Sequence, residues 1–147
     1  MDLKQLRKLF PKLTKKNCRF ASPEDTKYNC IAFAVSVNDI WWEPDPGFNY
    51  FWPLGVPRAY SVSAYRLAFG AQGYLPCDNA KVEADFQKVA LYAKNNLPTH
   101  ASKQLPDGWW ASKLGRDVDI EHTLAALENG IYGTAIEFLK KRTAPVP

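Results

Sequence analysis

Of all the side chains in this sequence, one cysteine stands where a nucleophile would be expected. Cys30 follows the polar pair Tyr28-Asn29 and opens an apolar run over residues 31–35, which predicts a buried helix with the thiol in its first turn. A helix N-terminus and a neighbouring imidazole both stabilise the thiolate, which is the reactive form of cysteine. Cys30 is therefore the candidate nucleophile.

His100 is the candidate base for this thiol. It opens an expected strand seventy residues after Cys30, and a rigid strand is a good platform from which to aim an imidazole at a helix end. Cysteine on an early helix followed by histidine on a later strand is the chain order of papain-like hydrolases. In such a pair, the histidine takes the thiol proton and later protonates the leaving amine.

A third group should orient the imidazole, and hairpin pairing places Ser112 close to it. A hydroxyl holds an imidazole less well than a carboxylate does, so three aspartates remain alternatives: Asp107, Asp117 and Asp119. The backbone N–H of the nucleophile, with a side chain next to it, would stabilise an oxyanion. The residues expected to contact substrate are Tyr28, Asn29, Trp42, Trp110 and Lys113.

The elements that must position these side chains follow from periodicity and turn residues. We expect helices over residues 2–10, 30–35, 61–70 and 119–129, strands over residues 86–93 and 131–139, and a hairpin joining residues 99–105 to 109–113. Residues 38–60 are so rich in proline and aromatic residues that they predict an ordered loop. The expected class is α+β, in a single domain over residues 1–147.

Two resemblances sharpen this interpretation. The segment Tyr28-Asn29-Cys30-Ile31-Ala32-Phe33-Ala34 resembles the Tyr-Asp-Cys-Ser-Gly-Phe-Val nucleophile motif of the NlpC-like branch of papain-like cysteine hydrolases. The stretch Thr99-His100-Ala101-Ser102 is similar to the histidine-bearing strand of that branch. The resemblance implies a nucleophile helix packed on an antiparallel sheet, with Cys30 and His100 as the catalytic pair. Ile31 departs from the motif, where a small residue follows the nucleophile.

The second resemblance covers most of the chain. A family of small bacterial proteins shares Asn-Cys-Ile-Ala, His-Ala, Asp-Gly-x-Trp-x-Ser-Lys-Leu-Gly, Asp-Ile-x-His and Ile/Val-Tyr-Gly. Here these motifs begin at Asn29, His100, Asp107, Asp119 and Ile131. This resemblance implies a family but no activity.

Composition restricts the classes of function further. Three cysteines without paired spacing do not form a disulfide framework, and no signal peptide or membrane span is apparent, so a cytoplasmic location is expected by default. Export without a cleaved signal stays open. A zinc site would have to combine Cys30, Cys77, His100 and His122, whose spacing is not that of zinc motifs. No metal or organic cofactor is expected.

The predicted function is hydrolysis or transfer at an amide bond. The substrate would be a peptide, a peptidoglycan stem, a glutamine side chain or an isopeptide. One alternative is a non-catalytic interaction protein, adaptor-like or immunity-like, on the same scaffold, with the cysteine buried and unreactive. A second is nucleic-acid binding by the basic ends of the chain, which has no recognition motif to support it and would require the basic residues to share one face.

Overall fold

The computed structural model describes residues 1–143, and most of the structure is one seven-stranded sheet. Every neighbouring pair of strands is antiparallel. The spatial order is β1 (Cys18–Ser22), β6 (Asp119–His122), β5 (Trp110–Lys113), β4 (Leu97–Gln104), β3 (Phe86–Lys94), β7 (Thr134–Arg142) and β2 (Leu75–Cys77). Strands far apart in the chain therefore become neighbours.

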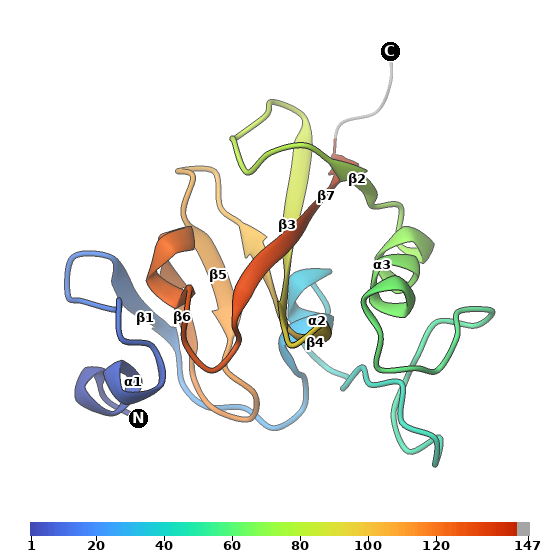
Figure 1. Cartoon of the computed structure of the whole chain (residues 1–147), viewed down its shortest axis with the longest axis horizontal. Coiled ribbons are helices and arrows are strands. Elements are labelled where there is room, and N and C mark those ends of the chain that lie inside the picture. The colour runs from blue at the N-terminus through green and yellow to red at the C-terminus, as the bar shows by residue number, and fades with distance from the viewer. Residues whose placement is uncertain (144–147) are drawn as a thin grey trace.

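The helices are few and short. They are α1 (Leu3–Leu9), α2 (Cys30–Ala34), α3 (Val62–Ala71) and a 3₁₀ helix, η1 (Leu124–Leu127). Figure 1 shows α1 beside β1 at one end of the molecule, and α3 with the long loop before it at the other. Within residues 1–143, none of these helices has the length and apolar character that a membrane crossing requires.

Alternation along the strands divides the core into two clusters on opposite faces of the sheet. In β3, Val89 and Leu91 belong to the cluster that packs against α2 and α3. Their neighbours Ala90 and Tyr92 belong to the cluster that packs against α1. Successive strand residues point to opposite faces. Alternation along each paired strand therefore tells on which face of the sheet a side chain lies.

The prediction of an α+β class with a papain-like, NlpC-like fold is wrong. It required a buried nucleophile helix packed on the sheet as a major element, but α2 has five residues and the sheet dominates the structure. The apolar run does start a helix, but the backbone leaves the helical region at Ser36, where φ is 65°. A non-glycine residue at positive φ ends a helix.

Several local predictions agree with the structure, and one region differs. The strand over residues 86–93, the hairpin and the helix over residues 61–70 are present with small shifts of boundary. The expected helix over residues 119–129 is instead the strand β6 followed by η1. Asp119, where the expected helix would begin, pairs with Lys113 in the sheet.

Asn29 connects the start of α2 to the loop that follows it. Its side-chain oxygen accepts the N–H of Ala32, 3.3 Å away, and the N–H of Trp42, 3.1 Å away. Its side-chain nitrogen donates to the carbonyl oxygen of Trp42 at 2.6 Å. One buried amide thus serves as helix cap and as anchor for the aromatic loop.

We therefore expect Asn29→Ala to destabilise the fold more than the loss of an ordinary cap. Three hydrogen bonds disappear and buried backbone groups of Trp42 lose their partners, so the free energy of unfolding should fall by about 2–3 kcal/mol. Urea unfolding followed by tryptophan fluorescence measures this. Ser61→Ala is the control, because Ser61 caps α3 with one bond to Ala64 and should cost about 1 kcal/mol. Equal losses in both variants would contradict the double role.

Candidate functional site

Cys30 lies in the first turn of α2, where the sequence placed it. Burial is the dominant influence on its thiol and raises the pKa to about 11. The backbone N–H groups of Ala101 and Ile31 favour the thiolate, but they do not offset the loss of solvent. At neutral pH the Cys30 thiol is protonated, the opposite of what a nucleophile needs.

His100 lies on the face of the sheet opposite to α2. Ala101, the next residue of β4, belongs to the cluster that Cys30 packs against, so His100 points to the other face. There its ring stacks on Tyr132, with centroids 4.1 Å apart and planes 3° apart. Its Nε2 lies 2.8 Å from Ser112 Oγ, and its Nδ1 has no hydrogen-bond partner. The expected contact between His100 and Ser112 is present, but no hydrogen bond joins His100 to Cys30.

Ser112 is the centre of a buried polar network. Its Oγ lies 2.6 Å from Ser102 Oγ, 2.7 Å from His122 Nε2 and 2.8 Å from His100 Nε2. These four side chains are fully buried. They come from three adjacent strands, β4, β5 and β6.

The proton positions in this network follow from one carbonyl group. His122 Nδ1 lies 2.8 Å from the carbonyl oxygen of Thr123, which can only accept, so Nδ1 carries the proton. In the neutral ring, His122 Nε2 then accepts the hydroxyl proton of Ser112. The Ser112 oxygen is left to accept from Ser102 and from the Nε2–H of His100. The unpartnered Nδ1 of His100 is then unprotonated. A buried lone pair without a partner costs less free energy than a buried N–H without one.

Both histidines are held neutral by their surroundings. Burial lowers the pKa of His122 to about 4, although the Thr123 carbonyl opposes the shift. Burial, followed by the proximity of His122, lowers the pKa of His100 well below its usual value. Neutral rings fit the proton order given above, and neither imidazole carries charge to stabilise a thiolate.

The network lies where backbone pairing between β4 and β5 stops. Only Lys103–Ala111 and Gln104–Trp110 are paired between these strands. Ser102 and Ser112 follow as the next residues, and their side chains, not their backbones, continue the connection. The polar network therefore replaces ladder hydrogen bonds at the centre of the sheet.

The residues predicted to contact substrate are buried and divided between the two faces. Tyr28 donates from its hydroxyl to Asp119 Oδ2 at 2.9 Å, and Lys113 donates to the carbonyl oxygens of Gly115 and Asp117. Trp42 packs in the cluster on the α2 side and Trp110 in the cluster on the α1 side. Only Trp110 lies on the face opposite to the thiol. On the thiol's own face, the polar groups of Tyr28, Asn29 and Lys113 are already bonded within the protein.

The aspartates considered as a third catalytic group do not lie beside Cys30 and His100 as a pair, and the zinc hypothesis is not supported either. Asp107 forms an ion pair with Arg19 at 2.9 Å, while Asp119 accepts from Tyr28 on the α2 side. Within residues 1–143, no group of three histidine, cysteine or acidic residues could hold a metal ion. Three surface hollows of about 500, 310 and 450 Å³ are lined by residues other than Cys30, His100 and Ser112.

Sequence reasoning missed the role of His122. His122 falls within the helix expected over residues 119–129, whereas in the structure it ends β6 and contacts Ser112. The signal was available, because alternation in Asp119-Ile120-Glu121-His122 puts the isoleucine and the histidine on one face of a strand. Ser102 directly follows the His100-Ala101 dipeptide. It is two residues from His100 on the same strand, so strand alternation places both side chains on one face.

Comparison with known proteins gives a family match. Residues 19–140 match a family described as "Domain of unknown function (DUF7689)". No curated protein and no solved structure matches the chain.

We expect Ser112→Ala to be among the most damaging substitutions in the core. It leaves the Nε2 atoms of His100 and His122 and the hydroxyl of Ser102 without their partner, which should lower the free energy of unfolding by about 2–4 kcal/mol. Urea unfolding measures the change. Ser63→Ala is the matched control, because its hydroxyl contacts only that of Ser61 near the surface. A loss below about 1 kcal/mol in Ser112→Ala would show that the network contributes little.

Proposed function

This chain belongs to the DUF7689 family, and we propose that it is a non-catalytic binding protein that holds a partner polypeptide through its aromatic loop, residues 38–60. The observation that carries the proposal is the state of Cys30. A protonated thiol with a pKa near 11, and no hydrogen bond to His100, lacks the two features that activate a cysteine nucleophile. This argues against the amide hydrolase that the sequence motifs favour.

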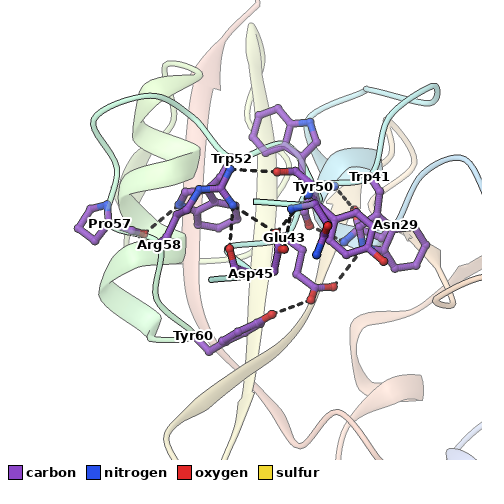
Figure 2. A network of polar contacts seen from close by, with 11 residues as sticks. Asn29, Trp41, Glu43, Asp45, Tyr50, Trp52, Pro57, Arg58 and Tyr60 are labelled. Atoms are coloured by element: carbon purple, nitrogen blue, oxygen red, sulfur yellow. Dashed lines mark hydrogen bonds and ion pairs between the residues drawn. The ribbon is translucent and has the colours of Figure 1, made fainter. Parts of the chain in front are cut away.

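The aromatic loop is irregular but well braced, as Figure 2 shows. Arg58 is its main brace, donating to the carbonyl oxygens of Asp45 and Tyr50 at 3.0 Å and forming an ion pair with the Asp45 carboxylate at 3.2 Å. Trp52 donates from its indole nitrogen to the carbonyl oxygen of Pro57 at 2.9 Å. A loop fixed in this way loses little conformational entropy on binding, which favours recognition.

The loop also presents apolar side chains to solvent. Phe48 is 73% exposed and Leu54 is fully exposed, and both line a hollow of about 450 Å³. Phe48 has φ of 56°, a conformation that bulky residues rarely adopt, and the Arg58 guanidinium lies 4.3 Å from its ring centroid. Holding a phenylalanine outward in a strained conformation costs of order 1–3 kcal/mol, and such strain concentrates at binding sites. An exposed apolar surface of this kind supports contact with another polypeptide.

Charge indicates the nature of the partner. The loop has three acidic residues and one basic residue in a chain of net charge +4. Asp45 is buried and paired with Arg58, which leaves Asp39 and Glu43 as the loop's acidic side chains without an ion pair within residues 1–143. An acidic, apolar surface complements a partner segment that combines basic and apolar side chains. The basic ends of the chain do not form the single face that nucleic-acid binding would use, because α1 and β7 lie towards opposite edges of the sheet (Figure 1).

We expect the Cys30 thiol to react slowly with an alkylating reagent. In iodoacetamide labelling followed site by site with mass spectrometry, Cys30 at pH 8 should react on the order of a hundredfold more slowly than a free thiol, because so little of it is thiolate. Cys77 is the internal reference, because its residue is partly exposed to solvent, as that of Cys30 is. His100→Gln keeps a polar group near Ser112 and should leave the Cys30 rate unchanged.

Fast labelling of Cys30 below pH 8, lost in His100→Gln, would overturn the proposal. That result would establish an activated thiolate–imidazole pair and restore the hydrolase hypothesis.

A further inference from the structure

Glu43 lies at the centre of a cluster of aromatic side chains in the aromatic loop. Its Oε1 accepts the indole N–H of Trp41 at 3.1 Å, and its Oε2 accepts the hydroxyl of Tyr60 at 2.6 Å. Figure 2 shows the carboxylate between Tyr60 on one side and Trp41 with Tyr50 on the other. The Trp41 and Tyr50 rings are 6.0 Å apart at their centroids. Three π-systems thus lie around one fixed carboxylate.

The negative charge of Glu43 has no cation of its own. Within residues 1–143, no lysine or arginine forms an ion pair with it. Arg58, the main brace of the loop, is paired with Asp45. The two hydrogen bonds that the Glu43 carboxylate accepts come from neutral donors, Trp41 and Tyr60. The bond from Tyr60 raises the pKa of that phenol to about 12. The carboxylate is therefore oriented but not neutralised.

The faces of the aromatic rings attract cations, and a cation is the partner that the Glu43 carboxylate lacks. The guanidinium of Arg116 already lies 4.8 Å from the Trp41 ring centroid. Tyr60 is 47% exposed and Tyr50 is partly buried, so both rings can be reached from solvent. Ring faces next to a carboxylate form the environment that recognises ammonium and guanidinium groups, by cation–π attraction and ion pairing together.

We propose that Glu43, Trp41, Tyr50 and Tyr60 form a recognition site for a lysine or arginine side chain of the partner polypeptide. This deepens the proposed function and rests on it. The cation would pair with the Glu43 carboxylate and lie against the exposed tyrosine rings, while Phe48 and Leu54 contact apolar residues of the same segment. The basic side chain sets the register of the partner, and the apolar contacts contribute area.

The site is fixed before binding. The N–H of Glu43 donates to the Phe51 carbonyl oxygen at 3.0 Å, and the N–H of Phe51 donates to the Trp41 carbonyl oxygen at 3.2 Å. The carboxylate is additionally held by its two side-chain donors. A preorganised site of this kind gives specificity even when one contact is weak.

The test is an NMR titration that uses the Trp41 indole N–H as reporter, since its hydrogen bond to Glu43 makes it sensitive to the carboxylate. The probes are the N-acetyl amides of arginine and lysine at constant ionic strength, with the N-acetyl amide of citrulline as the neutral analogue of arginine. We expect both cations to shift the Trp41 signal saturably at millimolar concentration and citrulline to leave it unmoved.

Variants separate the charge from the fold. Glu43→Gln keeps one acceptor oxygen, for the Trp41 indole N–H, and its amide N–H can donate to the Tyr60 hydroxyl oxygen. It should weaken binding of the arginine probe about tenfold, and Tyr60→Leu should weaken it several-fold. Glu24→Gln removes an exposed carboxylate outside the loop and should have no effect. Equal shifts from citrulline, or unchanged binding in Glu43→Gln, would overturn the site. If either result is found while Cys30 is unreactive, only the recognition site is rejected. If Cys30 is reactive, the proposed function is rejected.

Discussion

The hydroxyl of Ser112 is the constraint on which the centre of this fold depends. It joins β4, β5 and β6 where the backbone ladder between β4 and β5 has ended. A single hydroxyl can donate once and accept twice, and here all three capacities are used inside the core. Satisfied buried networks of this kind stabilise one arrangement of strands, because any shift would leave several polar groups unpaired.

This constraint also determines what the histidines can do. His100 and His122 give their Nε2 atoms to Ser112 and are neutral because they are buried. Cys30 packs on the other face of the sheet, against Ala101 and its neighbours. The sheet therefore separates the thiol from both imidazoles. The surface left with chemical character is the aromatic loop, which Asn29 and Arg58 hold in place.

Local sequence signals predicted the elements better than their faces. The helix start at residue 30, the strand starting near residue 86 and the hairpin joining residues 99–105 to 109–113 follow from short-range chemistry, and all are present. The side of β4 on which His100 points depends on register with β3 and β5, which local sequence does not specify. Strand alternation over residues 119–122 indicates the face on which His122 lies, but only if these residues are interpreted as a strand and not as the start of a helix. The short edge strands β1 and β2 carry too few residues for a periodic signal.

The nitrogen shifts of the two histidine rings, followed by NMR from pH 7 to pH 4 in the intact protein and in Cys30→Ser, test the central claim most directly. The account predicts two neutral rings at pH 7, with His122 protonated at Nδ1, His100 protonated at Nε2, and titration of His122 near pH 4. Replacing Cys30 should leave both rings unchanged. An imidazolium at neutral pH that disappears in Cys30→Ser would contradict the account, because it would show a thiolate–imidazolium pair.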